Sequence, residues 1–540
     1  MAVVTRSGFK RGTHARGPRR RSAAGEDEGS PRGVQEAIRS VSMLVLLFSA
    51  SAVHAQHEAG GGSTRDVGGG SVTANVRTAR APAKQPVSRP TTPERRRSPS
   101  TPKTRGIDAD DYYEQGNKYL NAKQYPEAIE AYNNAIRLNP RFAEAYYGLG
   151  WINSEQGQYE VAIAALAKAL RSKPDYADAL IELGYANRNL KRYDEALDAY
   201  RRAISLKPDS ATAFYEVGWI NNEREKYAEA VASLKQALVL KTDYPDAHNE
   251  LGYAYRKLGK YSEAIGEYKE AIRLKPDMGQ AYLGLGDVYY YNTKQYAEAI
   301  DAYKEGVRLK PDNSIAFYNL GWSYNEREQY SDAVGALNEA IRVKANYPEA
   351  YTELGYANRK LGEKLPDKST EARERFEAAI AAYKSAIRLK SDYATSYTGL
   401  GDVYYSDLKD CRQAVETYEQ SLRLKPDNAT VQYKVGWCYN DLGRYGEALE
   451  PLRQAIRLKP EYPEAHVELG YAYRQSGRHT EAIEEYKMAI RQKPDSANAH
   501  YNLGIAYLLA NNKDAAMQEY RILQKLDQST AQKLYEKINK

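Results

Sequence analysis

Residues 252–286 read GYAYRKLGKYSEAIGEYKEAIRLKPDMGQAYLGLG. The stretch begins and ends on a glycine, Gly252 and Gly286. Ala264 stands twelve positions after the first glycine, and Tyr268 stands four positions further on. Apolar residues recur here at helical spacing, which indicates one buried stripe. Pro276 ends the helix, because proline cannot donate the N–H that a continuing helix needs. The stretch therefore predicts two helices joined by a short turn.

The same pattern returns along the chain at a nearly constant period. Its glycines are Gly116, Gly150, Gly184, Gly218, Gly252, Gly286, Gly321, Gly355, Gly401, Gly436, Gly470 and Gly504. The interval from Gly252 to Gly286 recurs throughout, except that it is one position longer before Gly321 and Gly436 and twelve positions longer before Gly401. The longest interval holds twelve extra residues, Lys364 to Arg375, which we expect to form a charged surface excursion; the alternative is a helical extension packed on the repeats. Such a period is typical of stacked repeats.

Each shared residue has a steric reason. Glycine in the first helix and alanine in the second allow close approach, and the Tyr or Leu four residues after the alanine fills the gap beside them. The lysine before the proline faces the negative end of its helix, and we expect the aspartate after it to cap the next helix, as in Lys275-Pro276-Asp277. Twelve copies in register predict an all-α chain.

In these residues the sequence resembles the tetratricopeptide repeat family. The resemblance covers Ala109 to about Gln528, so we expect twelve repeats over residues 108–528, with the insertion 364–375 in repeat eight. It implies a right-handed α-solenoid whose first helices line a concave groove for peptides or protein partners. Residues 529–540 are expected to form a polar capping helix over the last apolar face, as stacked repeats require.

The residues before 108 have a different composition. They hold 19 Lys/Arg against 7 Asp/Glu, so this arm carries a charge of +12 while the remainder carries −5. Residues 42–53 have the length of the hydrophobic region of a secretory signal, and cleavage after Ala55 would leave Gln56 first. We therefore expect a signal-bearing extension over residues 1–55 and export, periplasmic or extracellular, from a bacterium. A chance apolar patch on a cytoplasmic protein is the alternative, and a start of translation near Val34 would repair the long polar lead.

Residues 56–107 are rich in Gly, Ser, Thr, Pro and Arg, which predicts a disordered linker. Arg95, Arg96 and Arg97 could touch an anionic surface weakly, although the favoured interpretation is a solvated linker. No aromatic residues are interleaved with these arginines, which argues against nucleic acid as a partner.

A longer period groups the repeats in threes. All four tryptophans directly follow a repeat glycine. In the repeat after each tryptophan, a tyrosine occupies the same position. One repeat further on, the residue that directly follows Gly286 and Gly401 is an aspartate. Helical phase places these side chains and those one turn later on one stripe, the concave one if the family geometry holds. The predicted peptide-binding groove consists of Trp151, Trp219, Trp322, Trp437, Tyr253, Tyr356, Tyr471, Asn222, Asn325, Asn440, Arg256, Arg359 and Arg474. The competing interpretation is that these residues pack against the neighbouring repeat and pair with one another.

The residue types in this stripe suit an extended polypeptide, because amides bond its backbone, aromatics cover apolar side chains and arginines pair with carboxylates. No catalytic triad, zinc motif or phosphate loop is present, so we predict a non-catalytic scaffold or adaptor without metal or cofactor. The sequence does not identify the protein or peptide partner of this scaffold. The alternatives are an envelope-associated module that recognises a non-protein polymer such as glycan, or an accessory subunit of a modifying enzyme. No apolar run is long enough to span a bilayer.

Overall fold

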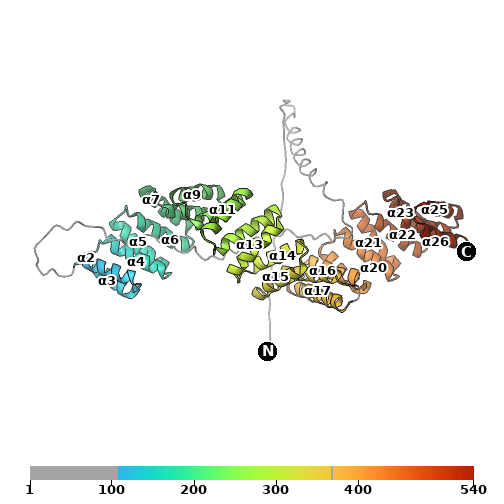
Figure 1. Cartoon of the computed structure of the whole chain (residues 1–540), viewed down its shortest axis with the longest axis horizontal. Coiled ribbons are helices and arrows are strands. Elements are labelled where there is room, and N and C mark those ends of the chain that lie inside the picture. Colours follow the sequence, from blue (N-terminus) through green and yellow to red (C-terminus); the bar gives the residue numbers. More distant parts are fainter. Residues whose placement is uncertain (1–107, 367–368) are drawn as a thin grey trace, which may run out of the picture. The chain divides into compact units, whose positions relative to one another are not determined.

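The computed structural model describes residues 108–366 and 369–540, and within them all regular structure is helical. The predicted signal segment, its cleavage site at Ala55 and Gln56, and the linker over residues 56–107 lie outside the described residues. Consecutive helices form antiparallel pairs in which each helix packs on the next, so the predicted all-α solenoid is confirmed (Figure 1).

Each repeat contributes a first and a second helix. The first helices in the described residues are α2 (Ala109–Asn121), α4 (Ala143–Glu155), α6 (Ala177–Asn189), α8 (Ala211–Glu223), α10 (Pro245–Lys257), α12 (Gly279–Asp287), α14 (Ser314–Glu326), α16 (Pro348–Glu363), α18 (Ala394–Asp402), α20 (Ala429–Asp441), α22 (Pro463–Gln475) and α24 (Ala497–Leu509). The second helices are α3 (Tyr125–Leu138), α5 (Tyr159–Ser172), α7 (Tyr193–Leu206), α9 (Tyr227–Leu240), α11 (Tyr261–Leu274), α13 (Tyr296–Leu309), α15 (Tyr330–Val343), α17 (Thr370–Leu389), α19 (Cys411–Leu424), α21 (Tyr445–Leu458), α23 (His479–Gln492) and α25 (Lys513–Leu526). A final helix, α26 (Gln528–Ile538), packs against α24 and α25.

The repeat glycines are required by close packing. A Cβ added at Gly252 would lie 3.1 Å from the Tyr268 ring, and one at Gly284 would lie 2.5 Å from the same ring. Tyr268 is therefore clamped between the first helices of two successive repeats, and it is buried. At Gly150 the side chain of Leu166 takes the same place, 2.6 Å from the added atom. The gap-filling role predicted for Tyr or Leu is seen in these contacts.

The predicted helix caps lie one residue later than expected. Asp277 does not cap α12, and Asp209, which follows Pro208 in the same way, does not cap α8; the N-cap residues are Met278 and Ser210. Ser210 accepts a hydrogen bond from the backbone N–H of Ala213, whereas Met278 offers no such acceptor. The turn after the proline is one residue longer than the sequence suggested, so the aspartate lies outside the helix.

The insertion in repeat eight is not the surface excursion that we expected. Its second half extends α17, which begins at Thr370. Ser369 caps the extension, Ala372 is buried, and the ring of Phe376 packs on Gly362 of α16. The sequence analysis did not predict this helical extension because the segment is rich in charged residues. Its buried face needs only a small residue and therefore gives no apolar pattern.

The one extra residue in repeats six and nine is absorbed inside a helix. A π-helical turn follows α12 as η1 (Val288–Thr293) and follows α18 as η2 (Val403–Asp407). A π-turn accommodates an added residue without shifting the helices on either side, and such turns often mark functional sites. The longer glycine intervals before Gly321 and Gly436 therefore have a structural cause.

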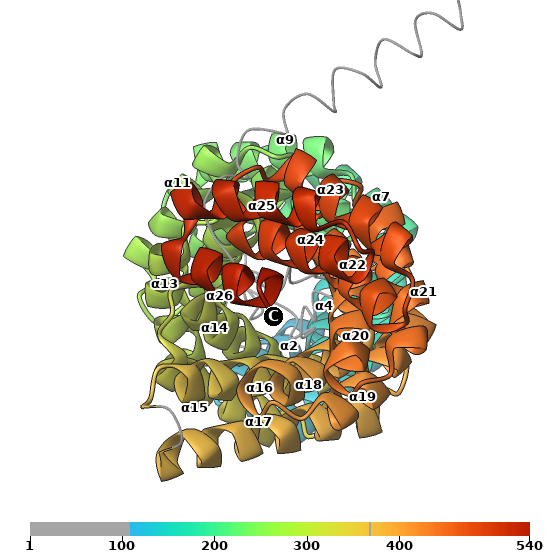
Figure 2. The ribbon, with the colours of Figure 1, turned by 90° about the vertical axis from the view of Figure 1, so that its right-hand side faces the viewer.

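The first helices share one face of the repeat stack, called here the inner face. In Figure 2, α14, α20, α22 and α24 lie inside the second helices α13, α21, α23 and α25. The inner face therefore carries the side chains that each first helix directs away from its partner helix. The predicted groove residues lie on these helices.

Candidate functional site

Three asparagines on the inner face join neighbouring repeats. The side-chain amide of Asn222 donates to the backbone carbonyl of Glu250 and to its carboxylate, both at 3.0 Å. The equivalent contacts are those of Asn325 with Glu353, at 3.3 and 3.0 Å, and of Asn440 with Glu468, at 3.0 and 2.9 Å. All three asparagines are buried. The structure thus places these predicted binding residues in inter-repeat hydrogen bonds, as the competing interpretation described.

The arginines one turn after the Tyr positions reach into the next repeat. Arg188 Nη1 lies 2.6 Å from the Glu216 carboxylate, and both side chains are buried. Arg256 Nη1 lies 3.4 Å from Asp287, whose carboxylate also accepts a hydrogen bond from Tyr303. Burial raises the pKa of Asp287, and the guanidinium of Arg256 opposes this shift.

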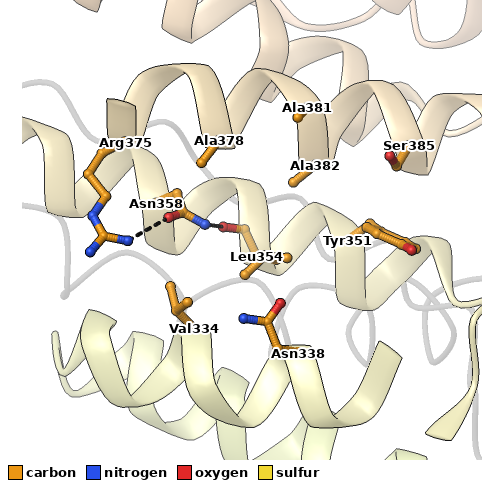
Figure 3. Close-up of a pocket in the computed structure, with 10 residues that line it drawn as sticks. All are labelled: Val334, Asn338, Tyr351, Leu354, Asn358, Arg375, Ala378, Ala381, Ala382 and Ser385. Carbon is orange, nitrogen blue, oxygen red and sulfur yellow. Dashed lines mark hydrogen bonds between the residues drawn. The ribbon is translucent and has the colours of Figure 1, made fainter. Parts of the chain in front are cut away.

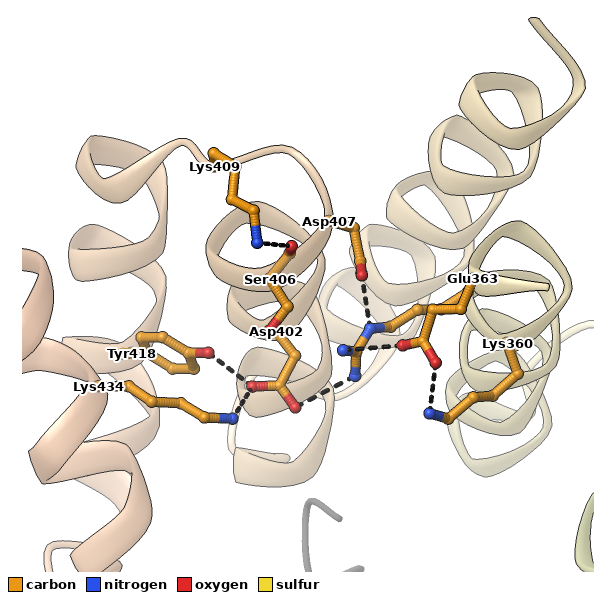
Figure 4. A network of polar contacts seen from close by, with 9 residues as sticks. Lys360, Glu363, Asp402, Ser406, Asp407, Lys409, Tyr418 and Lys434 are labelled. Carbon is orange, nitrogen blue, oxygen red and sulfur yellow. Dashed lines mark hydrogen bonds and ion pairs between the residues drawn. The ribbon is translucent and has the colours of Figure 1, made fainter. Parts of the chain in front are cut away.

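Arg359 is the centre of a larger network, and its partners Glu363, Asp402 and Asp407 are labelled in Figure 4. Its Nε lies 2.7 Å from Asp407 and its Nη1 lies 3.4 Å from Asp402. Asp402 also accepts hydrogen bonds from the Tyr418 hydroxyl at 2.5 Å and from Lys434 Nζ at 2.6 Å. The side chain of Asp402 is 2% exposed and that of Arg359 is 11% exposed. The network therefore ties α16, α18, η2, α19 and α20 together.

Burial is the dominant influence on the acid next to this arginine. Burial raises the pKa of Asp407 to about 6, and the guanidinium of Arg359 partly offsets that rise. Glu216 shows the same balance, because burial raises its pKa and Arg188 opposes the shift. These carboxylates are held by their arginines and are not free to receive a ligand.

The tryptophans of the predicted groove pack against the preceding repeat. Trp151 and Trp322 are each only 9% exposed, whereas Trp219 and Trp437 are half-buried. The Trp322 ring lies edge-on to Tyr290 at 4.9 Å. Consequently Trp219 and Trp437 keep some accessible surface, and Trp151 and Trp322 keep little.

The tyrosines of the predicted groove are half-buried and retain an accessible edge. Tyr253, Tyr356 and Tyr471 each stand edge-on to the first tyrosine of a second helix, with ring centroids 6.2, 6.1 and 6.0 Å apart. A cation lies against each of these rings: Arg256 at 5.8 Å, Lys360 at 5.8 Å and Arg474 at 5.1 Å. These rings offer a surface both aromatic and cationic.

Next to the buried asparagines and arginines runs a row of accessible polar residues, called here the polar row. It consists of Glu223, Lys257, Glu326, Lys360, Asp441 and Gln475, of which Glu223 and Lys360 are half-buried and the others exposed. Acidic members follow the asparagines and basic members follow the arginines, until Gln475 ends the series without a charge. The inner face therefore alternates in charge along the repeats.

Sequence reasoning missed the acids that hold the arginines. Asp287 stands one repeat after Arg256, and Asp402 stands one repeat after Arg359, where the twelve-residue insertion lengthens the interval. This spacing could have predicted the pairs from the sequence, because an arginine and an acid that are one repeat apart lie on adjacent first helices. The partner of Arg188, Glu216, follows a similar spacing.

The three histidines that precede a repeat glycine by four residues each pair with a glutamate of the neighbouring second helix. Nδ1 of His248, His466 and His500 lies 2.6 Å from Glu267, Glu485 and Glu519, respectively. Across residues 108–366 and 369–540, no cluster of His, Cys, Asp and Glu has the composition of a metal site.

A cavity of about 400 Å³ lies among α15, α16 and α17 (Figure 3). Small residues of α17, namely Ala378, Ala381 and Ala382, form one wall. Polar groups at the opposite side come from Asn338 and Asn358, and Arg375 donates to the Asn358 side chain at 3.3 Å. None of the predicted groove residues lines this cavity, so it is separate from the predicted groove.

Stacked helix pairs with one shared face define a repeat scaffold of the α-solenoid class. Residues 116–153, 218–259, 322–362, 372–407, 438–473 and 470–511 match the family described as TPR repeat. Residues 154–211 and 249–314, and separately 394–428, match families described as tetratricopeptide repeat. The chain belongs to the tetratricopeptide repeat family. This repeat is typically a non-catalytic scaffold for contacts between proteins.

Several solved structures align over parts of the chain. MamA is 27% identical, with a TM-score of 0.29, over 31% of this chain and 92% of MamA. YrrB, described as a TPR protein with an unusual peptide-binding site, is 25% identical with a TM-score of 0.31, over 35% of this chain and 96% of YrrB. The Cut9–Hcn1 hetero-tetramer of APC/C is 14% identical with a TM-score of 0.35, over 74% and 96%. No curated protein matches the chain. None of the helices in the described part is long and apolar enough to cross a membrane.

Proposed function

We propose that the chain is a scaffold that binds extended polypeptide segments along its inner face. The observation that carries the proposal is the recurrence, every three repeats, of a half-buried tyrosine with a cation against its ring: Tyr253, Tyr356 and Tyr471. A polypeptide running along the repeats would meet the same group several times. Several weak contacts on a preformed surface add to useful affinity.

The predicted groove residues divide into two roles in this proposal. Tyr253, Tyr356 and Tyr471, with the accessible edges of Trp219 and Trp437, contact the ligand. The asparagines and Arg256 and Arg359 act as positioning residues, because the Nδ2 amides of the asparagines donate to the neighbouring repeat and both guanidinium groups pair with its acids. Arg474 lies against the Tyr471 ring and interacts with Tyr486, and in this proposal its guanidinium also pairs with an acidic side chain of the ligand.

The polar row favours ligands of mixed charge. Exposed Lys257 and Glu326 lie on the inner-face helices α10 and α14, so a segment that carries an acidic and a basic residue at matching positions would be paired at both. Such contacts are exposed and screened by salt, so they direct register more than they add affinity.

A selection from a random-peptide phage library against the full chain tests the proposal. Peptides enriched on the wild-type chain should lose at least tenfold in affinity for the variant in which Tyr253, Tyr356 and Tyr471 are all replaced by alanine. A control variant removes exposed apolar groups of second helices, Val161→Ala and Val239→Ala, and should bind normally. Equal binding by the tyrosine variant, with its helicity intact, would refute the inner face as the binding surface.

We also propose that the chain is exported, with cleavage between Ala55 and Gln56. The support is the apolar stretch over residues 42–53 followed by a small-x-small site. N-terminal sequencing of the protein from its native host would find Gln56 first. Recovery of the residues before it on an intracellular protein would contradict export.

A further inference from the structure

The chain's two cysteines lie against each other where α19 meets α20. Cys411 is the first residue of α19, and Cys438 lies in the second half of α20. Both are buried in one apolar cluster at the contact between α19 and α20, and each thiol is close enough to influence the pKa of the other. Because the whole sequence contains only two cysteines, this one contact brings together every thiol of the chain.

Comparison among the chain's own repeats shows that both cysteines depart from the pattern at the same junction. Each tryptophan-bearing repeat follows a second helix, and the two positions compared are the first residue of that helix and the residue after the tryptophan. The pairs at the four junctions are Tyr125 and Ile152, Tyr193 and Ile220, Tyr296 and Ser323, and Cys411 and Cys438. A single cysteine here would be a small buried residue with no further consequence. Two that occur together have a shared chemistry that neither has alone.

We propose that Cys411 and Cys438 are a disulfide site that joins repeats nine and ten. One thiolate attacks the disulfide of an oxidant such as oxidised glutathione, which forms a mixed disulfide and releases one glutathione thiol. The second cysteine then attacks the protein sulfur of the mixed disulfide and releases the second glutathione thiol. The two cysteines lose two protons and two electrons, and the glutathione disulfide is reduced by the same amount.

The location indicates what the bond would stabilise. Tyr418, on the same helix as Cys411, donates to Asp402 in the Arg359 network, and Tyr405 of η2 lies close to both cysteines. A covalent link between α19 and α20 would therefore hold Tyr418 and its helix in place and so stabilise the network. The closed loop runs from residue 411 to residue 438, so the link also removes conformational freedom from the unfolded chain.

Burial also decides when the bond can form. Burial raises the pKa of Cys411, so little reactive thiolate exists once α19 and α20 have packed. The exchange therefore takes place while this junction is open, during folding or local unfolding. After closure the state of the pair, oxidised or reduced, is retained. The proposal is independent of peptide binding by the inner face.

Refolding of the reduced full chain in a mixture of oxidised and reduced glutathione tests the proposal. After alkylation and digestion, mass spectrometry should find one cross-linked peptide that contains Cys411 and Cys438. Amide hydrogen exchange in α19 and α20 should be at least about tenfold slower than in the reduced protein. A disulfide that leaves exchange unchanged would refute the bracing role.

The matched control copies another junction of the same chain. The double variant Cys411→Tyr and Cys438→Ser reproduces Tyr296 and Ser323 and should fold without a cross-link. If the refolded wild-type chain has the helicity of this control but carries two alkylated thiols, the proposal is wrong. Glutathione-capped or intermolecularly linked cysteines would overturn it equally, since they show that the thiols do not meet.

Discussion

Replacing Arg359 by alanine should open the junction between repeats eight and nine. The substitution leaves Asp407 buried without its cation, while Asp402 keeps Lys434 and Tyr418. Breaking a buried ion pair by removing one partner costs about 3–5 kcal/mol. Because Asp402 keeps Lys434, and Glu363, the third acid paired with Arg359, keeps Lys360, we expect the lower end, about 3 kcal/mol.

Native-state hydrogen exchange measures this loss locally, which matters in a repeat array that unfolds in blocks. Amides of α16 to α19 in R359A should exchange about a hundredfold faster than in wild type. The matched control is Arg256→Ala, which removes the equivalent residue where Asp287 lies at 3.4 Å and stays bonded to Tyr303. Its effect should be clearly smaller, about 1 kcal/mol.

The pH dependence of R359A gives a second readout. Burial holds the pKa of Asp407 at about 6, above the 3.8 of an ordinary Asp, so the folded state binds this proton more tightly than the unfolded state. Its contribution therefore lowers stability as pH rises from about 4 to above 6. R359A removes the opposing cation, so the pKa of Asp407 should rise further and the loss of stability should continue to a higher pH than in the wild-type chain. Equal exchange rates in R359A and R256A, or a flat pH profile for R359A, would refute the reasoning.

Three further changes test other parts of the structure. Gly321→Ala should lower the free energy of chemical unfolding by about 1–3 kcal/mol, because the added Cβ would lie 2.6 Å from Leu337. In the same repeat, a Cβ added at Gly335 meets no neighbouring atom, so Gly335→Ala should stabilise the chain by about 0.5–1 kcal/mol. Equal effects of the two substitutions would contradict the packing. The hydrogen bond that His500 Nδ1–H donates to the Glu519 carboxylate raises the pKa of His500 above 6.5, so the stability from this pair is full below pH 6.5 and is lost as pH rises through the raised value. Hydrogen exchange in α24 and α25 should show this pH dependence, and His500→Gln should abolish it. Deletion of residues 364–375 should cost about 2 kcal/mol by urea unfolding, since it removes buried Ala372 and the cap at Ser369; a cost under about 1 kcal/mol would return the segment to a surface excursion.

The repeat spacing predicted the helices well because its cause is local. Glycine, alanine and the Tyr or Leu that follows must meet wherever two helices cross closely, and Gly252 with Tyr268 shows that contact directly. The extra residue before Gly321 was visible as a changed spacing. Its accommodation as a π-turn was not, because periodicity alone does not distinguish a longer loop from a widened helical turn.

The inner face was predicted less well for a related reason. Helical phase shows that Asn325 and Arg359 point the same way, but it does not show whether solvent or another repeat lies there. In the structure the Nδ2 amide of Asn325 donates to Glu353, and the guanidinium of Arg359 meets Asp402 and Asp407, so these donors already have partners. Pairing of this kind depends on the distance between repeats, which a single repeat does not encode.

The central claim is that the inner face separates residues that bind from residues that hold the repeats together. The most direct measurement compares Tyr356→Ala with Asn325→Ala, using one library-selected peptide for affinity and hydrogen exchange for stability. Tyr356→Ala should weaken peptide binding at least threefold with little change in exchange. Asn325→Ala should speed exchange in α14 and α16, by about 1.5–3 kcal/mol of lost stability, while peptide affinity stays within about twofold at a temperature where the chain is folded. Loss of binding by Asn325→Ala without loss of protection, or binding by Tyr356→Ala equal to that of the wild-type chain, would contradict this division of the inner face.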